Sequence, residues 1–254
     1  MKLLATARDL QRRRSRERRR DFVVEGVRSV EELLRSRLAI RGVIVAPSLA
    51  AHERGAALRT AIETTGVPTL EVSDRELEDA AATESPQGVL AVASIPEHDL
   101  ASLTLAERAR ILVLDGVQDP GNVGTLVRTA AAFGVAATVA MPGTVDFWNG
   151  KVVRSSMGAL FSHPTATLAW TELDAFLAAR AIPLWGAAAG GVALDSIDRA
   201  RVRRLAIVVG NEGAGLSPDA LQRVERSVAI RIEPAVESLN VAVAAGILLH
   251  HFQS

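Results

Sequence analysis

Several short runs in the second half of this chain are apolar at every position, and this feature constrains the fold most. Residues 111–114 read Ile-Leu-Val-Leu, and residues 205–209 read Leu-Ala-Ile-Val-Val. A strand with one face in water alternates apolar and polar side chains, so a run without polar positions is buried on both faces. Segments with helical spacing separate these runs. Strands that alternate with helices form a parallel sheet covered on both faces, so the sequence predicts an α/β fold.

A polar, proline-containing segment at residues 96–105 is the best candidate for a linker. Before it, short strands alternate with helices, which predicts a small α/β unit. The expected strands of the whole chain are at 22–24, 42–46, 69–72, 89–93, 111–114, 136–140, 182–187, 205–209 and 227–232. We therefore expect a first domain at residues 1–95, a linker at 96–107 and a second domain at 108–254.

The 29 basic and 29 acidic side chains of this 254-residue chain are unevenly distributed. Residues 1–41 carry 13 basic and 6 acidic side chains, and residues 3–20 are expected to form one basic helix. Of the 29 basic residues, 27 are arginine, whose planar guanidinium group suits phosphate. This favours a local phosphate-binding surface, and a solvated helix face is the alternative interpretation.

Composition also excludes several classes of protein. Because the chain has no cysteine, it has no disulfide scaffold, thiolate zinc site or cysteine nucleophile. The first ten residues include Lys2, Arg8 and Asp9 and lack the apolar core of a signal peptide. The most apolar stretch, residues 239–249, is about half as long as the ~20 residues that span a bilayer. We expect a cytoplasmic protein without a membrane partner and without a metal.

Three segments hold polar residues that the fold alone does not require, at residues 114–128, 208–217 and 237–241. In the first, we expect Asn122 to be the N-cap of a helix, and Arg128 lies off the buried stripe of that helix. In the second, Glu212 stands among three glycines, which allow a backbone to approach a ligand closely. In the third, we expect Ser238 to cap the last helix and Asn240 to lie in its first turn.

Each segment alone is also typical of an ordinary turn or helix cap. The glycines of the first segment, Gly116, Gly121 and Gly124, miss the G-x-G-x-x-G spacing of a dinucleotide-binding loop. A nicotinamide-dependent oxidoreductase is therefore a distant alternative.

Taken in order, the three segments resemble the three motifs of the SpoU (TrmH-type) RNA ribose 2′-O-methyltransferases, a family of the SPOUT superfamily. The resemblance is carried by Asn122 with Arg128, by Gly-Asn-Glu-Gly at 210–213 and by Glu-Ser-Leu-Asn at 237–240. Further segments resemble family members at residues 22–26, 85–88, 151–161 and 244–249. The first two of these resemble an L30e-like substrate-binding domain that precedes the catalytic domain in many members.

The resemblance implies a C-terminal SPOUT domain with a parallel sheet and a deep trefoil knot, preceded by a small L30e-like α/β domain. It also implies a homodimer through the C-terminal domain and S-adenosylmethionine as the methyl donor. The family's cofactor positions fall on Gly210, Ile230 and Leu239. Its catalytic and substrate positions fall on Asn122, Arg128, Glu212, Ser238 and Asn240. The arginines expected to bind RNA are Arg12, Arg13, Arg18, Arg19 and Arg154.

The role of Arg128 is open on chemical grounds. The family's usual mechanism makes the equivalent arginine the base that removes the proton of the 2′-hydroxyl. An arginine side chain has a very high pKa and loses its proton very reluctantly. A guanidinium is better suited to stabilising the developing alkoxide, or to binding the neighbouring phosphate, than to removing the proton.

The reaction expected from the resemblance is transfer of a methyl group to a ribose 2′-hydroxyl, with 23S ribosomal RNA as the preferred substrate. Transfer RNA is the alternative substrate. A non-catalytic RNA-binding or ribosome-assembly protein on the same fold is the alternative class. One departure concerns the loop before the third motif, where Pro234 stands in place of the family's glycine. Proline fixes φ and removes a hydrogen-bond donor, so the shape of this loop is expected to differ.

Overall fold

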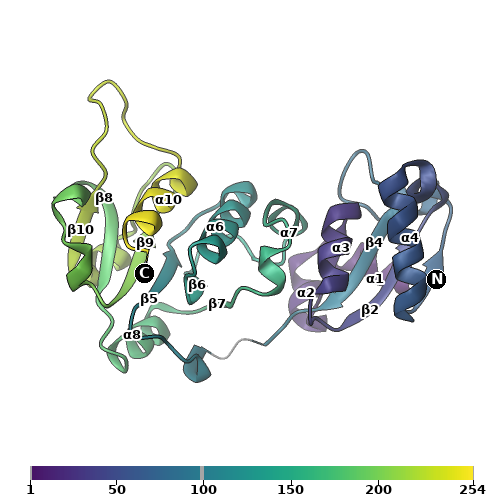
Figure 1. Ribbon diagram of the computed structural model, residues 1–254, viewed down its shortest axis with the longest axis horizontal. Helices are drawn as coiled ribbons and strands as arrows, with labels where there is room; N and C mark the ends of the chain where they lie inside the picture. Colours follow the sequence, from purple (N-terminus) through teal and green to yellow (C-terminus); the bar gives the residue numbers. More distant parts are fainter. Residues whose placement is uncertain (1, 98–99, 254) are drawn as a thin grey trace. The chain divides into compact units, whose positions relative to one another are not determined.

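The computed structural model describes residues 2–97 and 100–253 of the chain. The chain forms two compact units, and each is a sheet with its own helices (Figure 1). The first unit comprises Met1–Glu97 together with Asp146–Ser162, and the second comprises His98–Val145 together with His163–Ser254.

The first unit is built on a four-stranded mixed sheet of order β1-β4-β2-β3. Strand β4 pairs antiparallel with both β1 and β2, and β3 pairs parallel with β2. The strands are β1 (Asp21–Glu25), β2 (Ile40–Val45), β3 (Thr69–Glu71) and β4 (Val89–Ser94). The helices are α1 (Lys2–Asp9), α2 (Arg13–Arg19), α3 (Val27–Arg35), the 3-10 helix η1 (Pro47–Ala51), α4 (Glu53–Thr65) and α5 (Asp74–Glu78). The small α/β unit expected before residue 96 is therefore present.

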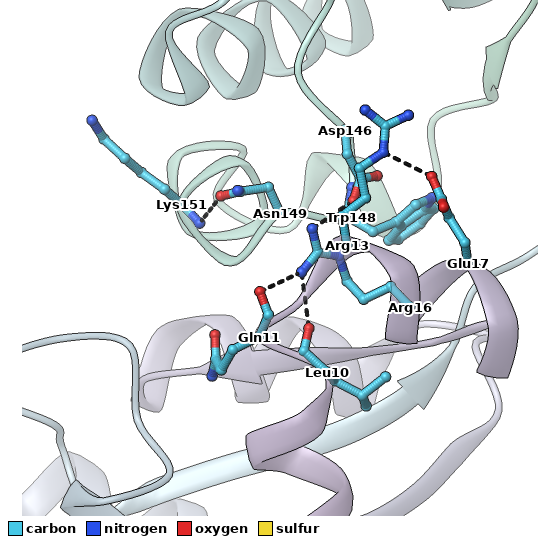
Figure 2. Close-up of polar contacts among 9 residues, drawn as sticks. All are labelled: Leu10, Gln11, Arg13, Arg16, Glu17, Asp146, Trp148, Asn149 and Lys151. Carbon is cyan, nitrogen blue, oxygen red and sulfur yellow. Dashed lines mark hydrogen bonds and ion pairs between the residues drawn. The ribbon is translucent and has the colours of Figure 1, made fainter.

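The prediction of one helix over residues 3–20 is wrong, because the helix is interrupted between α1 and α2. The guanidinium of Arg16 donates hydrogen bonds to the carbonyl oxygens of Leu10 (2.8 Å) and Gln11 (3.0 Å), which follow the end of α1 (Figure 2). Arg16 also pairs with Asp146 at 2.7 Å, and only 4% of its surface is exposed. A buried arginine requires such partners, and here they replace the hydrogen bonds of a continuous helix.

Residues 146–162 belong to the first unit, although they lie between two strands of the second unit along the chain. They include α7 (Gly150–Ser155) and the 3-10 helix η3 (Ala159–Phe161). The buried ring of Phe22 contacts the rings of Trp148 and Phe161, with centroids 4.5 Å and 6.1 Å apart. These aromatic contacts and the Arg16–Asp146 pair fix the segment to β1 and α2.

The second unit is built on a six-stranded sheet of order β10-β8-β9-β5-β6-β7, in which every pair is parallel. Its strands are β5 (Ala109–Leu114), β6 (Ala137–Ala140), β7 (Thr165–Thr167), β8 (Leu184–Ala193), β9 (Arg204–Val209) and β10 (Arg226–Ala229). Its α-helices are α6 (Pro120–Ala132), α8 (Trp170–Ala178), α9 (Pro218–Arg223) and α10 (Val241–His251). Its 3-10 helices are η2 (Leu100–Ser102), η4 (Leu194–Ser196) and η5 (Arg199–Arg201). The predicted α/β fold with a parallel sheet is confirmed.

The apolar strands form the centre of this second sheet. Every residue of β5 is buried, and so is every residue of β9 after Arg204. Ile111, Val113 and Val208 share one core cluster with Leu173 of α8. Burial on both faces explains why these strands show no alternation of apolar and polar residues.

The last helix, α10, is fixed at its C-terminal end by Arg110. Only 3% of the surface of Arg110 is exposed, and its Nε donates a 2.8 Å hydrogen bond to the carbonyl oxygen of Phe252. The two Nη atoms donate to the carbonyl oxygens of Ala109, Val202 and Arg203. One buried cation therefore satisfies four carbonyl groups from three parts of the chain.

We expect Arg110→Leu to lower the free energy of unfolding by about 3 kcal/mol, because it leaves several buried carbonyl oxygens without a donor. Urea denaturation measures this loss. Arg108→Leu is the matched control, since Arg108 is exposed and its one carbonyl partner is Ala200 among the contacts of the described chain. A loss of less than about 1 kcal/mol for Arg110→Leu would contradict the assignment.

Candidate methyltransferase site

A cavity of about 410 Å³ opens in the second unit, where strand β8 and the loops after β9 and β10 meet the start of α10. In a parallel sheet, ligands bind outside the carboxyl ends of the strands, because the loops that follow the strands converge there. Its lining residues are Ala187, Ala188, Ala189, Val209, Gly210, Asn211, Glu212, Gly213, Gly215, Val228, Ile230, Ile232, Glu237, Ser238, Leu239, Asn240, Val241 and Ala244. All three residues expected at the cofactor, Gly210, Ile230 and Leu239, therefore line one cavity.

The loop after β9 is held by Asn211, a residue that sequence reasoning did not select. Its backbone exchanges two hydrogen bonds with Gly215, of 2.9 Å and 3.0 Å. Its side-chain oxygen accepts the amide N–H groups of Gly213 and Ala214, and its side-chain nitrogen donates to the carbonyl of Gly116. Asn211 thus shapes the loop and ties it to the end of β5, a role that is typical of asparagine in turns.

Glu212, on the same loop, accepts hydrogen bonds from several donors of the segment after β5. Its Oε1 accepts the side-chain Nδ2–H of Asn122 at 3.0 Å and the amide N–H of Asp119 at 3.1 Å. Its Oε2 accepts the amide N–H of Gln118 at 3.2 Å. Glu212 therefore orients the side-chain amide of Asn122.

The protonation of Glu212 follows from these contacts. Burial acts to raise the pKa of Glu212, but the hydrogen bonds from Asn122, Asp119 and Gln118 outweigh burial and hold the pKa below its ordinary value of 4.5. A carboxylate with a lowered folded-state pKa stabilises the fold fully above pH 4.5, and this contribution is lost as the pH falls through the folded-state pKa.

We therefore expect the side-chain amide protons of Asn122 to keep constant NMR shifts from pH 8 down to about pH 4.5, and to move only below it. The Glu212→Gln variant should abolish this acid transition, because it removes the titrating group. A transition above pH 5 in the unaltered protein that disappears in Glu212→Gln would show that the carboxylate is not stabilised as described.

Asn122 is not the N-cap of α6, contrary to expectation. The cap is Asp119, whose Oδ1 accepts the amide N–H of Asn122 at 2.9 Å, and Pro120 occupies the first helical position. The sequence carried this signal, because an acidic residue followed by proline is a common helix start. Since Asn122 lies in the first turn, its side chain is free to reach across to the next loop.

Asn240 rather than Ser238 caps the last helix. The Oδ1 of Asn240 accepts the amide N–H groups of Ala242 (2.9 Å) and Val243 (3.4 Å), and α10 begins at Val241. The Nδ2 of Asn240 donates a 3.0 Å hydrogen bond to the Oδ1 of Asn122. Ser238 is exposed and lines the cavity two residues before the cap.

Three of the expected catalytic residues therefore form one hydrogen-bonded chain at the cavity. Asn240 donates to Asn122, and Asn122 donates to Glu212. Each of the three comes from a different motif of the sequence. The chain fixes the orientation of both amide groups, because a carboxylate accepts only from the NH₂ end of an amide.

Arg128 is placed differently from these three residues. It lies on α6 six positions after Asn122, which corresponds to about 9 Å along the helix axis. Its side chain is exposed, and within the part of the chain that the structure describes it makes no hydrogen bond or ion pair. The guanidinium is therefore available to a ligand.

Most of the arginines expected to bind RNA are engaged with carboxylates. Arg13 pairs with Glu17 at 2.7 Å, whereas Arg18 and Arg19 both pair with Asp9. Figure 2 shows Arg13 turned toward Glu17.

Arg154, on α7, is held by the buried carboxylate of Glu25 at 3.2 Å. The same carboxylate accepts the amide N–H groups of Ala82 and Thr83, and the hydroxyl of Thr83. The first unit therefore uses Arg154 to compensate a buried charge.

Comparisons with known proteins agree with this site. The model of the SpoU rRNA Methylase family matches residues 109–250. The chain belongs to the SpoU rRNA methylase family. The model of the MRM3-like substrate binding domain matches residues 4–91, so this SpoU methylase carries a separate N-terminal domain of that kind.

Relatives and structures of SpoU methylases match nearly the whole chain. The 23S rRNA (guanosine(2553)-2′-O)-methyltransferase RlmP of Bacillus subtilis is 33% identical over 96% of this chain and 93% of its own. A putative RNA methyltransferase of the TrmH family from Porphyromonas gingivalis is 30% identical with a TM-score of 0.82, covering 98% and 96% of the two chains. The SpoU methyltransferase AviRb of Streptomyces viridochromogenes, in complex with AdoMet, is 26% identical with a TM-score of 0.86, covering 98% and 96%.

The cavity of this SpoU methylase suits S-adenosylmethionine. Its volume falls within the range of about 300–1,000 Å³ that small-molecule sites occupy. Ala187 and Ala189 line the cavity with small side chains, and Ile230 and Leu239 line it with apolar ones. At Gly210 a Cβ atom would lie 2.5 Å from the amide nitrogen of Leu216, so the loop requires glycine at this position. Pro234, which departs from the family pattern, is exposed and is not among the residues that line the cavity.

Among the residues that the structure describes, no helix is both long and apolar enough to cross a membrane.

Proposed function

We propose that this SpoU methylase transfers the methyl group of S-adenosylmethionine to a ribose 2′-hydroxyl of 23S ribosomal RNA. The observation that carries the proposal is the hydrogen-bonded chain Asn240–Asn122–Glu212 beside a cavity lined by Gly210 and Leu239. The 23S rRNA 2′-O-methyltransferase activity of the Bacillus subtilis relative, which is matched over nearly its whole length, supports 23S ribosomal RNA as the substrate. In this proposal, residues 1–95 recognise the RNA, 96–107 are the linker, and 108–254 carry out the transfer.

When bound, S-adenosylmethionine supplies a methyl group on a positively charged sulfur, which an oxygen nucleophile attacks. Gly210, Ile230 and Leu239 would hold it, largely through backbone groups and apolar contact. The enzyme's own residues must place the ribose hydroxyl in line and favour the loss of its proton.

Arg128 is the residue assigned to the developing charge on the ribose oxygen. Its guanidinium has no competing carboxylate among the described contacts, so it keeps its full charge for the alkoxide or for the adjacent phosphate. A guanidinium is a poor proton acceptor, so the proton leaves to phosphate or water. Asn122 and Asn240 orient the sugar, Glu212 positions Asn122, and Ser238 offers a hydroxyl at the cavity.

Transfer RNA is the second candidate substrate, and a non-catalytic RNA-binding protein is the second candidate class. The presence of all five expected polar residues, from Asn122 to Asn240, favours an enzyme.

The test is transfer of labelled methyl from S-adenosylmethionine to separated ribosomal and transfer RNA from a strain that lacks the gene. We expect label in 23S ribosomal RNA at one position that resists alkaline cleavage, since 2′-O-methylation blocks attack on the neighbouring phosphate. Label only in transfer RNA would show that transfer RNA, and not 23S ribosomal RNA, is the substrate. Absence of label from both pools, with S-adenosylmethionine still bound in calorimetry, would support the non-catalytic class.

We also propose that the protein is a homodimer that associates through its C-terminal domain. Val243 and Ile247 of α10 are 51% and 38% exposed, and their spacing of four residues places them on one face of the helix. An apolar face that is exposed on one chain is suited to contact with a second copy of the chain.

The double variant Val243→Asp with Ile247→Asp should shift the protein from dimer to monomer in sedimentation, because charges are poorly tolerated in an apolar interface. Gln222→Asp, at an exposed position of α9, is the control and should leave the mass unchanged. A monomeric unaltered protein would refute the proposal.

A further inference from the structure

The arginines around α2 fall into two groups in the structure. Arg13, Arg18 and Arg19 are exposed and paired with carboxylates, and Arg16 is buried on Asp146. The others are exposed, and their side chains form no hydrogen bond or ion pair within the described chain: they are Arg12, Arg14 and Arg20.

The two groups differ in the local charge that they offer to an anion. Arg13 with Glu17 sums to zero, and Arg18 with Arg19 and Asp9 sums to a single positive charge. The hydrogen bonds of Ser15 and Arg19 to Asp9, and the nearby guanidinium groups, hold the pKa of this carboxyl below its ordinary value, so it stays negative. A phosphate at a paired arginine must displace or face a carboxylate, whereas a phosphate at an unpaired arginine meets an undiminished charge.

Arg20 also occupies a backbone position that disfavours its side chain. It is the C-cap of α2 in the left-handed region, with φ 55° and ψ 33°. Glycine or asparagine adopts this conformation at a lower cost in free energy than a residue with a long side chain. Its backbone is fixed by hydrogen bonds from its N–H to the carbonyl of Arg16 and from the N–H of Ile95 to its own carbonyl, but among the described residues its guanidinium forms no hydrogen bond or ion pair that offsets the strain.

Arg12 shows the same mismatch at the other end of the helix. It is the N-cap of α2 and accepts no side-chain hydrogen bond there, although serine or aspartate would stabilise this position. The two cap positions that flank α2 therefore carry arginine where the backbone alone favours other residues. An arginine that lowers the stability of the unbound protein, and that has no partner among the described residues, is suited to binding a ligand.

We propose that Arg12, Arg14 and Arg20 bind the phosphates of the substrate RNA, whereas Arg13, Arg18 and Arg19 have mainly the structural role of pairing with Glu17 and Asp9. The contacts are made by guanidinium groups and bind RNA independently of its sequence. This assignment rests on the proposed function, because it takes RNA as the substrate. It alters the prediction from sequence, in which Arg13, Arg18 and Arg19 were RNA-binding and Arg14 and Arg20 were not selected.

The test compares two full-length triple variants that change the net charge equally. The first is Arg12→Gln, Arg14→Gln and Arg20→Asn, where asparagine suits the left-handed backbone. The second is Arg13→Gln, Arg18→Gln and Arg19→Gln. Filter binding measures the dissociation constant of each for protein-free 23S ribosomal RNA and for poly(U), at 50 to 200 mM salt.

For the first variant we expect the slope of log K against log salt to fall by about 2 to 3, since each phosphate contact contributes about 0.7 to 0.9. Its affinity at 100 mM salt should fall by about 10- to 100-fold, and the KM for RNA should rise while kcat at saturating RNA is kept. For the second variant the slope should change by less than about 1.

Equal losses in the two variants would overturn the assignment and leave only a net-charge effect. A larger loss in the second variant, or no binding of either RNA by the unaltered protein, would also overturn it. A thermal unfolding midpoint within a few degrees of the parent confirms that each variant is folded. Methyl transfer by the unaltered protein tests the proposed function separately, so failure of one proposal is distinguishable from failure of the other.

Discussion

Replacement of Arg128 by lysine should lower kcat by about 100- to 1,000-fold while the dissociation constant of S-adenosylmethionine changes by less than about twofold. Loss of one preorganised group that stabilises charge in a transition state has an effect of this size. Lysine keeps the charge but lacks the planar fork that can bind an alkoxide and a phosphate oxygen together. The cofactor affinity should be kept, because Arg128 is not among the residues that line the cavity.

Single-turnover methyl transfer at saturating RNA measures kcat, and calorimetry measures cofactor affinity. Arg203→Lys is the matched control, because Arg203 is exposed beside Glu107 near the amino end of β9, away from the loops that line the cavity. The control should keep the kcat of the parent within about twofold. Unchanged turnover in Arg128→Lys would refute its catalytic role, and a rise in the KM for RNA alone would make it a binding residue.

The central strands were predictable because burial on both faces leaves a strong signal in sequence. Strands β5 and β9 are buried almost throughout and were located within one or two residues. Strand β7 was missed, because it has three residues, reads Thr-Ala-Thr and lies at the edge of the sheet. A short edge strand pairs on one side only, and its residues need not be apolar.

The helix ends were predicted less well than the helices. Asn122 and Ser238 were expected to be caps, but Asp119 and Asn240 have these roles. Serine, asparagine and aspartate all cap helices, so composition alone does not choose among neighbouring candidates. Which one caps depends on where the loop leaves the sheet, and this is a property of the tertiary fold.

Contacts between distant segments were the least predictable part. Nothing in the local sequence indicates that residues 146–162 pack with the first unit, because the Phe22–Trp148 and Arg16–Asp146 contacts join positions more than 120 residues apart. The association of Asn122, Glu212 and Asn240 became predictable only through the resemblance to a family. The trefoil knot also rests on that resemblance and stays a prediction. The spacing of apolar residues carries no information about whether a chain passes through one of its own loops.

Gly210→Ala should weaken S-adenosylmethionine binding by at least about 100-fold. The new Cβ atom would lie 2.5 Å from the amide nitrogen of Leu216 and closer still to the carbonyl of Gly215, where both neighbours are backbone and cannot rotate away. The loop must therefore move, and with it the hydrogen bonds that Asn211 makes to Gly215. A displaced loop alters one wall of the cavity and also the position of Glu212.

Gly246→Ala is the matched control, because it adds the same methyl group to a glycine of α10 that is not among the residues lining the cavity. Its Cβ atom would meet the side-chain methyl carbon of Thr129 at 3.7 Å, which is ordinary van der Waals contact. Calorimetry with S-adenosylmethionine should therefore give a dissociation constant within about threefold of the parent for Gly246→Ala. Equal affinities in the two variants would show that the loop after β9 does not hold the cofactor. Because Asn122 and Asn240 belong to other segments, a structural change confined to the loop should also break the hydrogen bond of Asn122 to Glu212 and leave that of Asn240 to Asn122 intact.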